Sequence, residues 1–494
     1  MKRQKRLGSI LISVISFFAL AAVPHIGTEY ASAAPAAGEE ERLVGIYINS
    51  ETFCNAFKRA EDKVFYSDIY NKTDVKKSLT LEEKVTDHTG EVVWTADKSF
   101  EINARTRILE AVVPKADNNG LYTLSMTLKE SGAVRDSFTG QFVVTEGTRK
   151  ASDIGACTHL QFSGSTQQLG LFENLGFNVV RDEALWQFVE QKKGVYSIPK
   201  RVQNYIDYAC GRQYEILMPL TYGNTLYMDP TDNTHTKMPK TDDEIAAYAK
   251  YCGFMAKELK GKVKYFEVWN EPNIKEFNYN ELPAADYAKV LKAAYNAIKS
   301  ANSEAVVIGG VCAFTTDSLI RQYYADLNSA GAFDFMDAVS IHPYACAGAK
   351  IGEGGNDFKW ITGVLKQYNK PIWVTEVGYY SSPTAAGGKP SYSEEEQAAY
   401  DARTVVLYRE SGGVERLVLY DLQDDGANKT LPGDNFGKIT VDFRAKPDFA
   451  AVAAAVHFVG NSKIKETKDN DSYSLFEFEN TKNTAEKVYV LWTK

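Results

Sequence analysis

Two glutamates, Glu271 and Glu376, each stand where a short apolar run of the chain ends. Splitting a glycosidic bond requires one group that protonates the leaving oxygen and a second group that meets the positive charge developing at the anomeric carbon. Two carboxyl groups suffice if burial and a neighbouring negative charge hold their pKa values apart. The two glutamates are therefore candidates for this chemistry, provided that the fold brings them together.

Eight apolar runs of this kind alternate with helical stretches between about residues 150 and 455. In chain order, the runs are Ile154–Cys157, Asn178–Arg181, Ile216–Pro219, Tyr265–Trp269, Ala305–Gly309, Ala338–Ile341, Ile372–Thr375 and Arg416–Tyr420. This alternation is typical of βα units and predicts an α/β fold, a (β/α)8 TIM barrel over residues 150–455. A doubly wound open sheet is the alternative, but it calls for a Gly-rich phosphate turn after the first strand, and the sequence has none there.

Barrel enzymes act from the carboxyl ends of their strands, so the fourth and seventh runs would carry both glutamates to the barrel mouth. There the two glutamates would face each other, and we expect their carboxyl oxygens to lie about 5 Å apart. Carboxyl groups separated by about 5–5.5 Å imply a covalent intermediate and retention of configuration. Strand-end glutamates that merely cap helices or pair with Arg and Lys are the structural alternative for either residue alone.

Two regions flank the predicted barrel. Residues 41–147 have the alternating pattern of strands and predict an N-terminal all-β sandwich of about seven strands, with a role in support or in carbohydrate contact. Residues 456–494 contain two runs, Tyr473–Phe478 and Val488–Trp492, that predict a short C-terminal β-hairpin. We expect this hairpin either to join the sandwich or to pack on the side of the barrel.

The first 33 residues have the pattern of a secretory signal peptide. Basic residues from Lys2 to Arg6 precede an apolar stretch from Leu7 to about Val23, and the small residues Ala31–Ala33 resemble a cleavage site. A membrane anchor is the alternative, but the apolar run is short for a membrane span. We therefore expect a secreted, extracellular protein with no membrane contact after cleavage.

The composition bounds the partners. A net charge of -8 argues against a nucleic acid, whose binding requires clustered Lys and Arg. The six cysteines are scattered without the spacing of a zinc or redox site, and the sequence lacks a Gly-x-Ser-x-Gly elbow, a His-Glu-x-x-His pair, a Walker loop and a dinucleotide fingerprint. We therefore expect no metal and no cofactor.

Export permits disulfides, and two pairings are open: Cys312 with Cys346, or Cys210 with Cys252. Cys252 also lies on the apolar stripe of a helix that a Thr241–Glu244 capping box would open, where a buried thiol behaves as a small hydrophobic side chain. Packing is therefore its expected role.

From about Ile154 to Ala454 the sequence resembles the clan A glycoside hydrolases, particularly the family 39 type that includes β-xylosidases and bacterial exopolysaccharide hydrolases. The segments that carry this resemblance are Trp269-Asn270-Glu271-Pro272 and Trp373-Val374-Thr375-Glu376-Val377-Gly378. The resemblance implies that Asn270 binds the sugar 2-hydroxyl, that Glu271 is the acid/base and that Glu376 is the nucleophile.

The resemblance also implies that Arg181, His342 and Tyr344 lie beside the nucleophile, since the clan places an Arg at the end of strand two and His-x-Tyr at the end of strand six. An Arg and a Tyr hydroxyl that donate to Glu376 would lower its pKa and keep it ionised. The structural alternatives are an ion pair inside the barrel for Arg181 and a hydrogen-bonded core residue for His342.

His159 resembles the His that many family 39 proteins place against the substrate. The sequence departs from the clan at the end of strand eight, where Tyr420 stands in place of a common Trp and could form the floor of the site instead. Trp186, Tyr222 and Asn224 also lie near strand ends, where aromatic faces stack on sugars, although large aromatic side chains are more often core residues.

Together these features predict a secreted, retaining glycoside hydrolase that acts on an oligo- or polysaccharide. A non-catalytic carbohydrate-binding barrel and a transglycosylase that uses the same glutamates are the alternatives.

Overall fold

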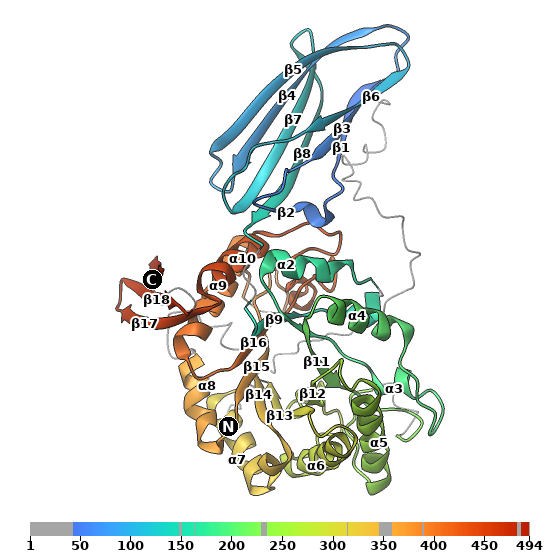
Figure 1. Ribbon diagram of the computed structural model, residues 1–494, viewed down its shortest axis with the longest axis vertical. Coiled ribbons are helices and arrows are strands. Elements are labelled where there is room, and N and C mark those ends of the chain that lie inside the picture. The colour runs from blue at the N-terminus through green and yellow to red at the C-terminus, as the bar shows by residue number, and fades with distance from the viewer. Residues whose placement is uncertain are drawn as a thin grey trace, which may run out of the picture.

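The computed structural model describes residues 43–147, 151–163, 165–228, 235–313, 315–344, 358–387, 390–481 and 486–493. A β-sandwich stands at one end of the long axis and a helix-covered barrel at the other, as Figure 1 shows. The predicted signal peptide and Cys346 lie outside the described residues. Within them, no helix combines the length and hydropathy that crossing a membrane requires.

Two sheets form the N-terminal region, in the strand orders β1-β3-β6 and β2-β8-β7-β4-β5. The strands are β1 (Val44–Asn49), β2 (Ala56–Lys58), β3 (Phe65–Asn71), β4 (Lys77–Asp87), β5 (Val92–Ile102), β6 (Thr106–Val112), β7 (Gly120–Glu130) and β8 (Ala133–Thr145). Alternate side chains of both sheets meet in one apolar cluster, which includes Ile46, Ile69, Leu81 and Met126. The predicted sandwich is thus present, with one strand more than expected because β2 is short.

The central region is a closed barrel of eight parallel strands, β9 to β16. They are β9 (Ile154–Cys157), β10 (Val179–Arg181), β11 (Glu215–Leu220), β12 (Tyr265–Val268), β13 (Val306–Ala313), β14 (Ala338–His342), β15 (Ile372–Val377) and β16 (Arg416–Leu419). Each corresponds to one of the eight predicted runs, so the TIM barrel is confirmed. Closure of the sheet through the pairing of β16 with β9 excludes the open-sheet alternative.

The interior of the barrel is layered along its axis. Each strand contributes one residue to an interior apolar cluster: Cys157, Val179, Leu217, Tyr265, Ile308, Ala338, Trp373 and Val418. Because strand side chains alternate between faces, residues two positions later point inward again. On four strands these later residues are polar: Arg181, Glu267, Ser340 and Thr375. The apolar layer therefore supports a polar layer nearer the mouth.

Helices cover the outside of the barrel (Figure 1). They are α1 (Leu160–Ser163), α2 (Phe172–Leu175), α3 (Trp186–Val189), α4 (Lys200–Gly211), α5 (Asp242–Glu258), α6 (Ala284–Ala301), α7 (Asp317–Ser329), α8 (Phe358–Leu365), α9 (Glu394–Ser411) and α10 (Pro447–Val459). The capping box of Thr241 and Glu244 opens α5 as predicted. Cys252 is a buried free thiol within α5, and Cys210 is also free, so the pairing of these two cysteines is wrong.

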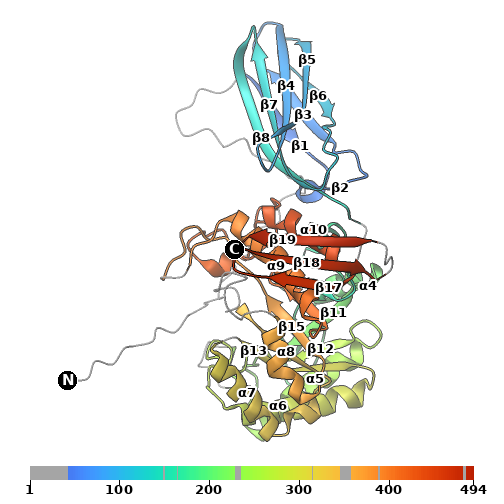
Figure 2. The same ribbon diagram turned by 90° about the vertical axis from the view of Figure 1, so that its left-hand side faces the viewer.

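The C-terminal residues form a three-stranded sheet of β17 (Ser462–Asp469), β18 (Tyr473–Asn480) and β19 (Lys487–Thr493). Figure 2 shows this sheet on the flank of the barrel, beside α9 and α10. The hairpin of β18 and β19 was predicted, whereas β17 was missed because most of its residues are charged or exposed. Phe476 and Phe478 join the apolar cluster of the barrel, so the sheet packs on the barrel side.

Candidate active site

Glu271 and Glu376 lie together at the barrel mouth, although 105 positions separate them in the chain. One carboxyl oxygen of Glu271 and one of Glu376 lie within 4.8 Å of each other, and both lie within that distance of a ring nitrogen of His342. The residues are 6% and 8% exposed. The two carboxyl groups are therefore close enough to act on one bond and shielded enough to perturb each other.

The local backbone explains how each glutamate reaches the mouth. Strand β12 ends at Val268, and the following turn includes Trp269 and Glu271 with φ of 70° and 45°, in the left-handed region that L-residues rarely adopt. Burial of the Trp269 ring and its Nε1–H bond to the Phe277 carbonyl, at 2.6 Å, hold this turn. In β15, the pairing with β16 shifts register between Val374 and Val377, and such irregularities re-aim side chains beside active sites.

Arg181, at the end of β10, joins the polar layer to the nucleophile candidate. Its Nε and Nη2 donate to Glu267 Oε2 at 2.9 and 2.7 Å, and its Nη1 donates to Glu376 Oε1. Its Nη2 also donates to Asn270 Oδ1 at 3.1 Å. Arg181 thus forms the internal ion pair that was the structural alternative and also contacts Glu376, because a guanidinium has enough donors for both.

His342 lies between the two glutamates and is fully buried. Its Nδ1 is 2.9 Å from Glu271 Oε1 and 3.6 Å from Glu376 Oε2, while its Nε2 is 2.9 Å from Thr375 Oγ1. Tyr344, two residues further on, donates its hydroxyl to Glu376 Oε2 at 2.9 Å. The predicted group of Arg181, His342 and Tyr344 therefore surrounds Glu376.

These contacts separate the protonation states of the two glutamates. Burial raises the pKa of Glu271, against the lowering effect of His342, and the charge of Glu376 raises this pKa further. Burial would also raise the pKa of Glu376, but the charges of His342 and Arg181 and the hydrogen bond from Tyr344 hold it below its ordinary value. Glu271 is thus the better proton donor, and Glu376 is the better nucleophile.

His159 and Tyr420 meet on one wall of the mouth. Their rings contact each other edge to face with centroids 5.5 Å apart, and His159 Nδ1 lies 3.2 Å from Glu183 Oε1. Tyr420 also contacts the Tyr344 ring at 6.0 Å and donates its hydroxyl to Asp425 Oδ2 at 2.8 Å. Both residues are therefore placed where a substrate contact is feasible, and that contact stays a prediction.

Two further candidates from the sequence have structural roles instead. Trp186 is fully buried, stacks on Tyr227 and donates its Nε1–H to Glu190 Oε2 at 2.7 Å. Asn224 donates to the Glu190 carbonyl at 2.8 Å and accepts from a backbone N–H two residues later. Tyr222 differs, because its half-buried ring packs against Trp269 at 5.6 Å, close to the turn that carries Glu271.

Sequence reasoning missed several polar residues that support the site. Glu267 is fully buried and accepts hydrogen bonds from Arg181 and from the Ser340 hydroxyl, the latter at 3.0 Å. The Thr375 hydroxyl contacts His342 Nε2, and its Oγ1 also lies 2.5 Å from Ser340 Oγ. Thr375 therefore links His342 to Ser340. The signal was a charged residue inside an apolar run, since period-two alternation places Glu267 on the same inward face as Tyr265.

Asp182 was missed as well. It accepts from the Thr158 hydroxyl at 2.6 Å and from the Leu160 N–H at 2.5 Å, so that it holds the loop that carries His159. Burial, and then the charge of Glu183, raise the pKa of Asp182 to about 7. A charged pair directly after the second predicted strand was the available signal.

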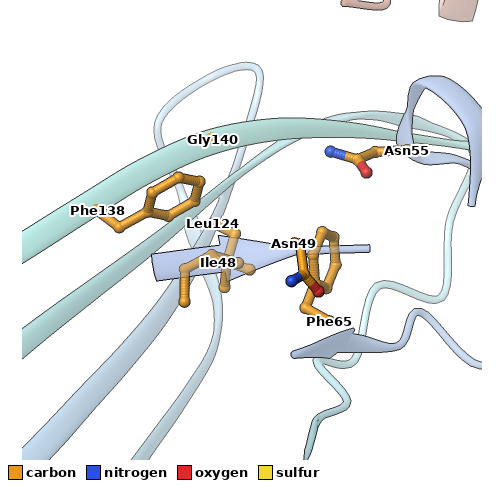
Figure 3. Close-up of a pocket in the computed structure, with 7 residues that line it drawn as sticks. All are labelled: Ile48, Asn49, Asn55, Phe65, Leu124, Phe138 and Gly140. Atoms are coloured by element: carbon orange, nitrogen blue, oxygen red, sulfur yellow. The ribbon is translucent and has the colours of Figure 1, made fainter. Parts of the chain in front are cut away.

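A small pocket lies elsewhere, between the sheets of the N-terminal sandwich (Figure 3). Its lining is Ile48, Asn49, Asn55, Phe65, Leu124, Phe138 and Gly140. The free space inside has room for about one water molecule, so this pocket is too small for a sugar. The chemistry concentrates at the barrel mouth instead.

Comparisons with known proteins support this view of the barrel. Residues 237–441, which include both glutamates, match the family model of the glycosyl hydrolase catalytic core. A family 39 glycoside hydrolase from the gut symbiont Bacteroides cellulosilyticus WH2 has a similar structure, with a TM-score of 0.70, 24% sequence identity, and coverage of 86% of this chain and 89% of that chain. No curated protein matches the sequence significantly.

Two other solved structures show lower similarity. A β-glucuronidase from Bacteroides uniformis has a TM-score of 0.42 and 13% identity, over 91% of this chain and 57% of that chain. GH5_18 from Streptomyces cattleya, in complex with GlcNAc, has a TM-score of 0.47 and 17% identity, over 63% and 80% of the two chains. The shared barrel of the family 39 structure confirms the predicted fold. The match to the catalytic-core model confirms the prediction of a glycosidase.

Proposed function

We propose that the protein is a retaining glycoside hydrolase that cleaves O-glycosidic bonds of an oligo- or polysaccharide by double displacement. The observation that carries this proposal is the approach of one Glu271 oxygen to within 4.8 Å of one Glu376 oxygen. Retaining enzymes hold their carboxyl groups about 5–5.5 Å apart, whereas inverting enzymes leave about 6.5–9.5 Å for a water molecule. The close pair favours a covalent intermediate.

In the first step, ionised Glu376 attacks the anomeric carbon while protonated Glu271 donates its proton to the leaving oxygen. Arg181 and Tyr344 hold the Glu376 carboxylate from two sides. Because Asn270 Oδ1 accepts from Arg181, the Nδ2 amino group is the part of Asn270 that can donate to a sugar hydroxyl.

In the second step, Glu271 takes a proton from water, and the resulting hydroxide displaces Glu376 from the sugar. Formation of the glycosyl ester removes the negative charge of Glu376, and this charge is one cause of the raised pKa of Glu271. The pKa of Glu271 therefore falls in the intermediate, and this fall suits its change from acid to base. His342 stays hydrogen-bonded to Glu271 and orients it through both steps.

Azide rescue tests the assigned roles. Glu271→Ala should still form the glycosyl-enzyme from a dinitrophenyl glycoside, which leaves without protonation, and should show a burst followed by slow turnover. Added azide, which requires no general base, should speed this turnover and give a product of retained configuration. Glu376→Ala should be inactive on natural substrates and give an inverted azide product from an activated glycoside.

Glu281→Ala is the matched control, because Glu281 is exposed and lies in the same loop as Glu271. It should keep normal activity. Inverted azide product from Glu271→Ala, or full activity of both catalytic variants on a polysaccharide, would contradict the assignment. A transglycosylase would be recognised by sugar transfer products that form when an acceptor sugar is added.

We also propose that the protein is exported. The support is the basic and apolar N-terminal pattern of residues 1–33. Mature protein should therefore accumulate in culture supernatant with an N-terminus near Ala34, as measured by N-terminal sequencing. Recovery of intact Met1 in the membrane fraction would contradict export by this route.

A further inference from the structure

Three side chains that the proposed mechanism does not use converge beside the nucleophile. His159, which follows β9, and Asp421 and Asp425, which follow the neighbouring strand β16, each offer one atom within 4.8 Å of the others. Asp421 is 1% exposed, and its Oδ1 has no hydrogen-bond partner among the described residues. His159 Nε2 is likewise buried without a partner. Native structures satisfy nearly all buried polar atoms, so two orphaned atoms in one cluster point to a ligand.

The cluster is rich in acceptors and poor in donors. His159 has at most two N–H groups, and Nδ1 faces Glu183 at 3.2 Å. Asp425 Oδ2 already accepts from the Tyr420 hydroxyl. One imidazole therefore stands among the carboxyl groups of Glu183, Asp421 and Asp425. We call these three carboxyl groups the acidic pole.

The cations near the acidic pole are committed to other carboxylates. Arg181 contacts Glu267 and Glu376. Lys438 and Lys446 are fully buried in ion pairs to carboxylates other than those of the acidic pole. Within the described part of the chain, no Lys or Arg lies within ion-pair distance of Asp421 or Asp425. The pole therefore keeps a surplus of carboxyl groups.

A chain of contacts places the acidic pole on the nucleophile side of the mouth. Tyr420 binds Asp425 and contacts His159, the Tyr420 ring contacts the Tyr344 ring, and Tyr344 donates to Glu376. In the proposed mechanism Glu376 becomes bonded to the sugar that stays on the enzyme after the first step. We therefore place the acidic pole beside that sugar and not beside the leaving group.

We infer that the acidic pole selects the sugar that becomes attached to Glu376: it binds hydrogen-bond-donating groups, hydroxyl or ammonium, and excludes uronic acids. This inference rests on the proposed retaining mechanism for the position of that sugar. Sugar hydroxyls or an ammonium group supply the donor that Asp421 Oδ1 lacks. A sugar carboxylate would instead bring a further negative charge beside Asp421, whose pKa is already raised by burial and by the charge of Asp425.

The test compares aryl glycosides in matched pairs: glucoside with glucuronide, and galactoside with galacturonide. We expect kcat/KM for the neutral member to exceed that for the uronide by roughly 100-fold or more, because negative charges brought together at a partly buried site repel each other strongly. Asp421→Asn and Asp425→Asn should each reduce this ratio of kcat/KM values by about tenfold, since each replaces an ionisable carboxyl group by a neutral amide of the same shape. Asp425 is the less buried of the two and gives the second variant if Asp421→Asn folds poorly.

Asp434→Asn is the matched control, because Asp434 lies in the same segment after β16 and accepts a backbone N–H of Asn428 instead. It should leave the ratio unchanged. An aryl glucosaminide distinguishes the two kinds of donor. If kcat/KM is higher for the glucosaminide than for the glucoside, and Asp421→Asn abolishes this preference, the acidic pole binds an ammonium group. If kcat/KM is equal for the two substrates, the acidic pole binds hydroxyl groups.

Two results would overturn the inference. The first is an unchanged ratio in both aspartate variants while Glu376→Ala is inactive, an outcome that leaves the proposed function standing. The second is stoichiometric binding of Ca²⁺, Mn²⁺ or Zn²⁺ by the intact chain in calorimetry that Asp421→Asn abolishes, because His159 and the two aspartates would then be metal ligands. If no glycoside is cleaved, calorimetry with glucose, glucosamine and glucuronate still tests the pole independently of catalysis.

Discussion

Two groups of buried charges lie in the same barrel, and they differ in how their charges are matched. At the mouth, Arg181 and His342 are shared among Glu267, Glu271 and Glu376. Each cation there contacts two carboxyl groups, so every carboxyl group competes for its partner. Burial raises the pKa of Glu271, whereas the charges of His342 and Arg181 hold the pKa of Glu376 below its ordinary value despite burial.

The second group lies beneath the segment that follows β16. Lys438 contacts Asp401 of α9 at 2.6 Å and Asp448 of α10 at 2.8 Å, and all three side chains are fully buried. Lys446 contacts Asp424 at 2.8 Å and also donates to the Asn435 carbonyl at 3.1 Å. These pairs join the segment that carries Tyr420 and Asp425 to the two helices behind it.

The comparison indicates how to tell chemistry from support among buried charges. Acidic residues that act together on one bond have to keep different protonation states. Their cationic partners are therefore shared between them and lie at unequal distances from them. A group that fixes a segment requires only that each charge has a close partner, because an unpaired buried charge is strongly destabilising. We therefore expect substitutions in the two groups to fail in different measurements.

The largest expected effect is on activity, at the mouth. Glu376→Gln removes the proposed nucleophile and should lower kcat by roughly 10,000-fold or more, the effect expected for a residue that forms a covalent intermediate. Its free energy of unfolding should change by only about 1 kcal/mol in either direction, because the variant also relieves repulsion from Glu267 and Glu271. Steady-state kinetics measures kcat, and denaturant unfolding measures the free energy of unfolding. A large loss of unfolding free energy in Glu376→Gln would contradict the difference between the two groups of buried charges.

The next effect is on stability, in the second group. Lys438→Met leaves Asp401 and Asp448 facing each other without a cation and should cost about 3–5 kcal/mol of unfolding free energy. Lys429→Met is the control, because Lys429 is 42% exposed and lies 3.3 Å from Asp424, so its loss should cost less than about 1 kcal/mol. Equal losses of unfolding free energy in the two variants would show that the ion pairs of Lys438 do not stabilise the segment after β16.

A smaller effect should appear in the pH profile of Tyr344→Phe. The Tyr344 hydroxyl donates to Glu376 and lowers its pKa, so removal of the hydroxyl raises this pKa. Glu376 then ionises at higher pH, and the acid limb of kcat/KM should move to higher pH. At neutral pH, kcat/KM should fall about tenfold, since a hydrogen bond to a charged group contributes about 1.5–3 kcal/mol.

Tyr420→Phe provides the comparison for this variant, because the Tyr420 hydroxyl donates to Asp425 and not to Glu271 or Glu376. Its acid limb should stay in place. The same shift in both variants would show that the position of the acid limb does not report the hydrogen bond to Glu376.

Much of the fold could be predicted because local rules apply to it. The eight barrel strands follow from buried apolar runs that alternate with amphipathic helices, and the start of α5 follows from its capping box. Strand β17 escaped prediction because its charged sequence pairs by backbone bonds with β18 and places few side chains in the core. Trp186 and Asn224 lie near strand ends as predicted, but whether such a side chain faces the mouth or the helices depends on packing.

The sequence by itself determined which residues stand at the ends of the barrel strands, since short apolar runs between stretches of helical period mark those strands without knowledge of distant contacts. It thereby placed Glu271, Glu376, Arg181 and His342 at one face of a barrel. Only the tertiary structure decided that Glu267 anchors Arg181 and that Asp421 and Asp425 converge on His159. Burial, charge and hydrogen bonding act over a few ångströms, and closure of the barrel sets those distances between residues that are far apart in the chain.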